Sequence, residues 1–100
     1  MVFDLLVDFR AHEDIDKAIE YYMNKDPSVA YKLYLRIQDA YAVLLVNPFF
    51  EIRYLTYRCF PIKDFPYMFH FSIDERKKLV QIHAFINTAM NPESSWLIED

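Results

Sequence analysis

Three basic side chains near the middle of the sequence, and one histidine further on, are the residues best suited to chemistry. Arg53, Arg58 and Lys63 fall within one stretch of strand-like alternation, and His83 falls in a later one. Cleaving RNA without a metal needs Arg or Lys at the phosphate and a general acid or base beside the 2′-hydroxyl. Arg58, Lys63 and His83 are therefore the candidate catalytic residues, with Tyr57 an alternative to His83. On residue chemistry alone, ordinary solubility charges are the better explanation of these cations.

Other kinds of site have weaker signals. The histidines and Cys59 show none of the CxxC, HxH or HExxH spacings that hold metals, so we expect no metal and no cofactor. Cys59 has Arg58 as its neighbour, but adjacent strand residues point to opposite faces, which favours a buried structural thiol. The chain contains no glycine, which excludes the glycine-dependent loops that bind nucleotide phosphates.

Composition predicts a single compact domain over residues 1–100. Apolar residues make up 54% of the chain and aromatic residues 18%, which is far from a disordered composition. The formal net charge of −4 argues against a strongly basic nucleic-acid binder. A single cysteine fits a reducing cytosol, and we expect no signal peptide, no membrane span and a cytoplasmic location.

The first half of the chain reads as one strand and two helices. Residues 2–9 alternate with period two, which predicts a strand with Phe3, Leu5, Val7 and Phe9 facing inward. Apolar residues at helical spacing then predict a helix over residues 11–24. Asp26-Pro27 suits the start of a second helix, and Asn47-Pro48 stops it. The short connection makes the two helices an antiparallel hairpin.

The second half reads as strands. Alternation predicts a strand over residues 52–57, a short or irregular one over 59–63, and two clear strands over 67–73 and 80–86. Pro92 can open a short last helix. The expected class is α+β, in the order β-α-α-β-β-β with a short C-terminal helix. The helical hairpin covers one face of a small, largely antiparallel sheet, and the other face is left partly open for a partner.

Several segments together resemble the RelE/ParE superfamily of toxins from type II toxin–antitoxin pairs. These segments are A-H-E-D-I-D-K-A-I-E-Y-Y from Ala11, L-L-V-N-P from Leu44, R-C-F-P-I-K-D-F-P-Y from Arg58, and N-T-A-M-N-P-E-S-S-W from Asn87. Each segment alone is weakly specific. Their order and spacing along the whole chain carry the resemblance, which includes the ParE-like plasmid stabilisation proteins.

The resemblance implies a small cytoplasmic bacterial protein that is neutralised by a cognate antitoxin. RelE-like members cut messenger RNA in the ribosome, whereas ParE-like members act on DNA gyrase and lack the RNase residues. An antitoxin of this kind commonly lays a helix or strand over the sheet and the helical hairpin. A homodimer and a toxin–antitoxin heterotetramer are both compatible with the residues.

The departures from the family pattern decide between the two branches. Met90 stands where many members have arginine, and Asn87 stands where histidine is common. Methionine cannot pair with a phosphate, and no C-terminal tyrosine follows Trp96. We therefore expect a ParE-like toxin that acts by binding its target. If the chain is an enzyme, we expect metal-independent cleavage of RNA. A ribosome-dependent ribonuclease and a non-toxic interaction module are the alternatives. The expected target contacts are Arg53, Arg58, Lys63, Asn87, Met90 and Trp96.

Overall fold

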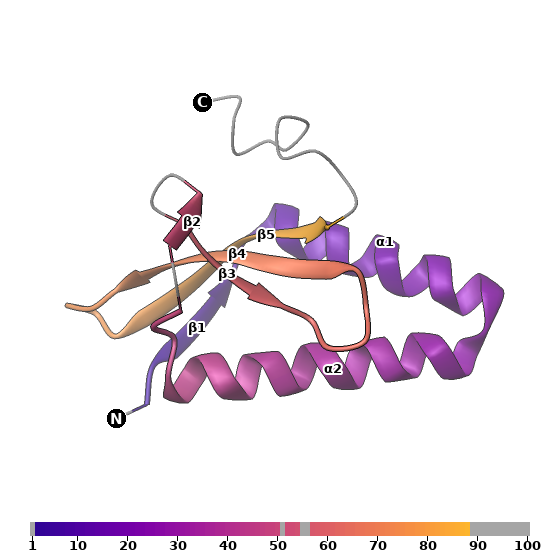
Figure 1. Cartoon of the computed structure of the whole chain (residues 1–100), viewed down its shortest axis with the longest axis horizontal. Helices are drawn as coiled ribbons and strands as arrows, with labels where there is room; N and C mark the ends of the chain where they lie inside the picture. The colour runs from indigo at the N-terminus through magenta and orange to yellow at the C-terminus, as the bar shows by residue number, and fades with distance from the viewer. Residues whose placement is uncertain (1, 51, 55–56, 89–100) are drawn as a thin grey trace.

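The computed structural model describes residues 2–50, 52–54 and 57–88, which form a helical hairpin packed on a five-stranded sheet (Figure 1). In chain order the elements are β1 (Asp4–Val7), α1 (Phe9–Lys25), α2 (Pro27–Val46), β2 (Ile52–Tyr54), β3 (Tyr57–Pro61), β4 (Tyr67–Asp74) and β5 (Leu79–Asn87). The strand order is β1-β5-β4-β3-β2. Among the strand pairs of the described residues, β1–β5 alone is parallel. The predicted α+β class and largely antiparallel sheet are confirmed, and the predicted last helix lies outside the described residues.

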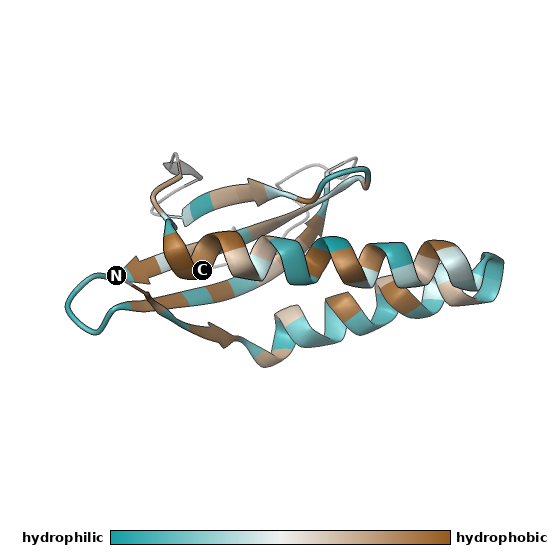
Figure 2. Cartoon of the chain, turned by 90° about the horizontal axis from the view of Figure 1, so that it is seen from below, coloured by the Kyte–Doolittle hydropathy of each residue, from teal (hydrophilic) through white to brown (hydrophobic). Residues whose placement is uncertain are grey.

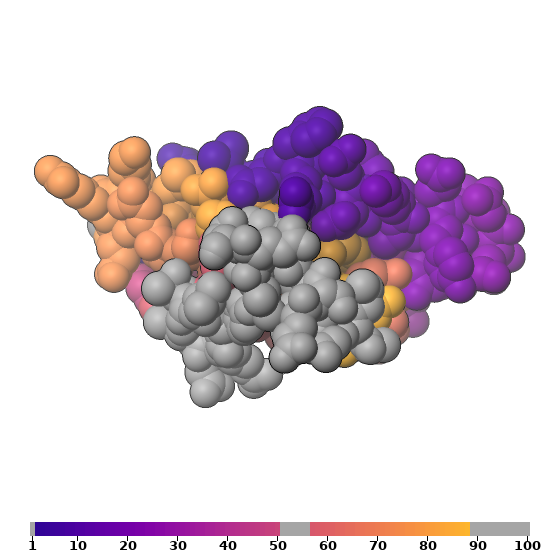
Figure 3. Space-filling view, turned by 90° about the horizontal axis from the view of Figure 1, so that it is seen from above, coloured from indigo at the N-terminus to yellow at the C-terminus, as the bar shows by residue number. Residues whose placement is uncertain are grey.

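Asp26 forms the junction of the helical hairpin. Its backbone N–H closes α1 on the Tyr22 carbonyl, and its side chain accepts a hydrogen bond from the Ser28 N–H at 3.0 Å. Pro27 occupies the first position of α2. This is the capped restart that the sequence predicts. Bonds from Ser28 lower the pKa of the Asp26 carboxyl. Figure 3 shows this end of the hairpin and the β4–β5 turn at opposite ends of the molecule.

The first strand is shorter than the sequence predicts. β1 ends at Val7, Asp8 takes the N-cap position, and α1 begins at Phe9. Phe9 therefore lies on the first turn of a helix, where its side chain is 77% exposed. The prediction that Phe9 faces the core is wrong, because the alternation of apolar residues continues by chance past the end of β1 into α1. Phe3 is buried as predicted.

The core lies between the helices and one face of the sheet. α2 contributes Leu33, Ile37 and Leu44, each at most 2% exposed, at the spacing of one helix face. Tyr41 stacks on Phe69 with ring centroids 5.4 Å apart, which joins α2 to β4. The remaining buried members of this cluster are Phe3, Ala11, Ile15, Ala18, Ala40, Ile62, Phe69, Phe71, Val80, Ile82 and Phe85.

A β-bulge in β5 reverses the alternation of the last strand. Phe71 pairs with Ile82, but His70 pairs with Ala84, so His83 is an extra residue on β5. Beyond it, Phe85 packs into the core and Ala84 shares the opposite face with His70. We call that opposite face, turned away from the helices, the far face of the sheet. The prediction that side chains alternate without interruption over residues 80–86 is therefore wrong beyond the bulge.

The predicted strand over residues 52–57 is also wrong in its extent. Tyr54 and Tyr57 are partners in the antiparallel β2–β3 pair, so the chain direction has reversed between them. Both residues have the aromatic side chains typical of strands, and composition alone gives no sign of the reversal.

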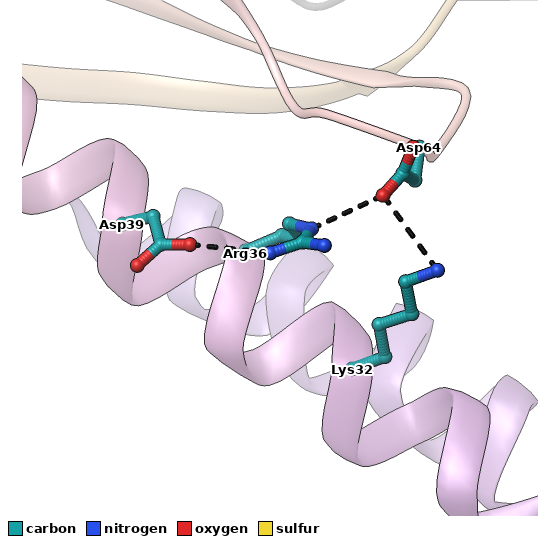
Figure 4. Close-up of polar contacts among 4 residues, drawn as sticks. All are labelled: Lys32, Arg36, Asp39 and Asp64. Carbon is teal, nitrogen blue, oxygen red and sulfur yellow. Dashed lines mark hydrogen bonds and ion pairs between the residues drawn. The ribbon is translucent and has the colours of Figure 1, made fainter.

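In the described part of the chain, Asp64 and Lys78 take the turn positions with positive φ, since the chain has no glycine. Asp64, with φ 70°, lies between β3 and β4 and accepts from Arg36 Nε at 3.2 Å. Lys32 lies 3.6 Å from the same carboxylate oxygen, and Figure 4 shows both cations rising from α2 towards it. Arg36 also contacts Asp39. These contacts hold the β3–β4 turn over α2.

A pair of leucines in α2 tests this packing. Leu33 is fully buried and Leu35 is 40% exposed. We expect Leu33→Ala to lower the free energy of unfolding by about 2–5 kcal/mol, since it removes buried methyl groups and leaves a cavity. Leu35→Ala should change it by less than about 1 kcal/mol. Urea denaturation followed by circular dichroism measures both, and equal losses would contradict the assigned helix faces.

Candidate functional site

Arg58 points towards the helical side of the sheet. Its β4 partner is Phe71, a core residue, and facing strand partners share one side. The Arg58 Nη1 donates a hydrogen bond to the Phe50 carbonyl oxygen, and the guanidinium lies 5.8 Å from the centroid of the Phe49 ring. Arg58 thus fastens the segment that follows α2 to the sheet.

Lys63 lies beyond the end of β3 and is exposed. It borders a small hollow of about 110 Å³ between α2 and β3. The other lining residues are Arg36, Asp39, Ala40, Val43, Phe60 and Pro61. Lys63 has no hydrogen bond or ion pair with another residue of the described ranges. The Asp64 carboxyl is its charged neighbour, with which it makes no close ion pair, and its ammonium group is otherwise exposed.

His83 lies on the far face of the sheet, inside a hydrogen-bonded cluster. Its Nδ1 is 3.1 Å from Asp8 Oδ2, and its Nε2 is 2.6 Å from Ser72 Oγ. The Tyr57 ring meets the imidazole edge-on, with centroids 4.9 Å apart. Sequence reasoning identified His83 and Tyr57 as candidates but had no signal for Asp8 or Ser72, since such groupings form only in space.

The three catalytic candidates therefore lie in different surroundings. Arg58 contacts the segment after α2, Lys63 borders the hollow beside α2, and His83 contacts Asp8 and Ser72 on the far face. Arg53 belongs to β2, and Asn87 ends β5 opposite Tyr67. Met90 and Trp96 lie outside the described residues. The functional role of each of these residues stays a prediction.

Two further polar residues on the far face are buried. Cys59 and His70 are strand partners and are 7% and 5% exposed. Burial lowers the pKa of the His70 imidazole, because the charged form is poorly solvated there. No group of three or more His, Cys, Asp or Glu side chains in the described ranges is arranged to hold a metal ion. No helix in the described part of the chain is long and apolar enough to cross a bilayer.

The outward side of α2, opposite its buried stripe, is also largely apolar, with the exposed Gln38 as its polar member. Tyr31, Leu35, Ala42 and Val46 are exposed there, at spacings that keep them on one side of a helix. Tyr34 joins them and stacks on Tyr31. We call these five residues the outer face of α2. Figure 2 shows apolar residues recurring along the length of this helix. In the sequence these residues form a second set of positions at helical spacing, which is hard to distinguish from the set that faces the core.

Comparison with known proteins adds a structural likeness. No protein-family model matches the chain, and no curated protein matches it in sequence. A chain of the chromosomal ParDE TA system from P. aeruginosa superposes with a TM-score of 0.71 and 19% sequence identity. The match covers 86% of this chain and 96% of that one. The two chains share a fold, and the fold implied by the RelE/ParE resemblance is confirmed.

Arg58 and Lys63 should respond differently to removal. We expect Arg58→Ala to lower the free energy of unfolding by about 1–3 kcal/mol, because the Phe50 carbonyl loses a charged donor. Lys63→Ala, at an exposed site, should change it by less than about 0.5 kcal/mol. Thermal and urea unfolding measure both. An Arg58→Ala protein as stable as the parent would show that this contact does not support the fold.

Proposed function

We propose that this chain is the toxin of a type II toxin–antitoxin system, of the ParE-like branch, and that it acts by binding a protein target. The observation that carries the proposal is the fold shared with a ParDE system chain over most of both lengths. The order of the sequence motifs from Ala11 to Trp96 supports it independently. DNA gyrase is the first target to test, and the cytoplasm is the proposed location.

The separation of the cations favours binding over catalysis. An RNase site needs a phosphate-binding cation and a general acid or base around one phosphodiester. Arg58 donates to the Phe50 carbonyl on the helical side of the sheet, whereas His83 contacts Asp8 and Ser72 on the far face. Lys63, exposed beside an apolar hollow, suits an anionic contact on a protein partner.

The outer face of α2 suits the antitoxin. Its apolar residues run along the helix at the positions that an amphipathic partner helix would cover. Tyr31, Tyr34 and Leu35 are 63%, 46% and 40% exposed. Apolar stripes on opposite sides of one surface helix indicate burial of both, one by the sheet and one by a partner. A homodimer or a toxin–antitoxin heterotetramer would accommodate this contact.

Induced expression tests the toxin function. We expect the chain, produced without its antitoxin in a bacterial host, to arrest growth, and co-expression of the adjacent gene to restore it. Lys63→Glu should weaken the arrest because it reverses the charge offered to the target, whereas the exposed Lys17→Glu on α1 should not. Unimpaired growth at confirmed expression would leave only a non-toxic interaction module.

A DNA supercoiling assay with purified gyrase then separates the targets. A ribosome-dependent endoribonuclease is the second candidate, favoured by the imidazole of His83 that Asp8 holds in place. Primer extension on messenger RNA after induction would reveal codon-linked cuts. Cuts that disappear in His83→Gln, with gyrase activity unaffected, would reverse the order of the two candidates.

The antitoxin contact has its own test. We expect Leu35→Asp combined with Val46→Asp to abolish co-purification with the product of the adjacent gene, since two carboxylates would be buried against apolar groups. Met23→Asp is the matched control, because Met23 is 49% exposed but lies on α1. Retained binding by the double variant would show that the antitoxin covers another surface.

A further inference from the structure

Three side chains from distant parts of the sequence form a continuous hydrogen-bonded chain on the far face of the sheet. Asp8 Oδ2 lies 3.1 Å from His83 Nδ1, and His83 Nε2 lies 2.6 Å from Ser72 Oγ. The side chains of His83 and Asp8 are 15% and 28% exposed, and Ser72 is partly exposed. We call this arrangement the Asp8–His83–Ser72 relay.

The fold fixes each member of the relay. Ser72 lies in the central strand β4, where its partner on β5 is Gln81. His83 is the extra residue of the bulge, a backbone feature that re-aims side chains. Asp8 follows β1 directly, and its backbone N–H donates to the Ile82 carbonyl at 2.9 Å. The parallel pairing of β1 with β5 therefore delivers the carboxylate to the imidazole.

The carboxylate of Asp8 does not cap the helix that follows it. Asp8 is the N-cap residue of α1, yet its side chain makes no capping hydrogen bond. A side-chain cap typically stabilises a helix by about 1 kcal/mol. Instead, Oδ1 accepts from Gln81 Nε2 at 2.7 Å and Oδ2 contacts His83. With Tyr57 edge-on to the ring, the imidazole is held on two sides.

These contacts define the direction of the proton relay. An ionised carboxylate only accepts, so in the neutral imidazole of His83 the Nδ1 carries the proton that is donated to Asp8. The lone pair of Nε2 is then left to accept the hydroxyl proton of Ser72. A serine whose hydroxyl donates to an imidazole oriented by a carboxylate is the general arrangement of an activated nucleophile.

We propose that Ser72 is a nucleophilic site that takes an acyl group from activated esters, a reactivity separate from the proposed toxin function. Ser72 Oγ attacks the ester carbonyl carbon, and its proton passes to His83 Nε2. The tetrahedral adduct collapses, the bond to the leaving oxygen breaks, and that oxygen takes the proton from Nε2. Acyl-Ser72 is formed, and water activated by the same imidazole hydrolyses it.

The substrate class follows from the position of Ser72 within the sheet. Backbone N–H groups of a central strand are directed at the neighbouring strands, so they are poorly placed to stabilise an oxyanion. Loss of one such donor slows acyl transfer by about a hundredfold to a thousandfold. The site therefore suits esters with good leaving groups, such as aryl esters, and slow deacylation should let the acyl-enzyme accumulate.

The test uses the purified full-length chain and p-nitrophenyl acetate. We expect release of p-nitrophenol together with one acetyl group per chain, which peptide mapping places on Ser72. Ser72→Ala should abolish the label, and His83→Gln should slow labelling by about a hundredfold. Ser28→Ala is the matched control, because Ser28 Oγ bonds to a carboxylate, that of Asp26, and to no imidazole in the described residues. Circular dichroism confirms that each variant is folded.

The Asp8→Asn variant tests whether Asp8 orients the imidazole of His83 or only supports the fold. The amide would donate to Nδ1 and force the proton onto Nε2, so Ser72 would lose its acceptor while the fold is kept. We expect labelling of Ser72 to fall to the level of His83→Gln, and ¹⁵N NMR of the ring to report the changed tautomer. Labelling of wild-type chain on lysine or His83, or at an equal rate in Asp8→Asn, would overturn the proposal.

Discussion

One extra residue in β5, His83, determines which side chains of the last strand reach the helices. Before it, Val80 and Ile82 face the core, and after it Phe85 does. Phe85 then stacks on Tyr67 with centroids 4.7 Å apart and contacts Phe69 at 5.4 Å. A shift of one residue turns every later side chain of a strand to its other face. The aromatic core and the polar relay on the far face therefore depend on the same backbone irregularity.

The two faces of the sheet use their polar groups differently. On the helical side, Arg58 bonds to the segment after α2, and Arg36 bonds to the β3–β4 turn. On the far face, the polar groups of Asp8, Ser72 and His83 satisfy one another. Polar groups on the helical side thus hold connecting segments to β3 and α2, while those on the far face join Asp8, β4 and β5 to one another. The proposed reactive serine and the proposed partner contact would therefore lie on different faces of the molecule.

Much of the fold could be predicted from the sequence, because its signals are local. The Asp26-Pro27 restart and the Asn47-Pro48 stop mark α2 correctly. The sequence could not show the bulge at His83, since an extra residue in a strand depends on pairing with β4. It also could not show that Arg58 points towards the core side or that Asp8 contacts His83. Those outcomes depend on sheet order, with β1 inserted beside β5 by parallel pairing.

The two apolar sides of α2 limit the substitutions that the helix can accept. Leu33, Ile37 and Leu44 are fixed by the core, and Tyr31, Leu35 and Val46 on the opposite side would be fixed by a partner. Gln38, within the outer side, and the flanks that carry Lys32 and Asp39 are left to vary. Among descendants of this chain, a partner could therefore change its own sequence more readily than α2 could. New binding specificities would then begin with changes in the partner, followed by changes at these variable positions of α2.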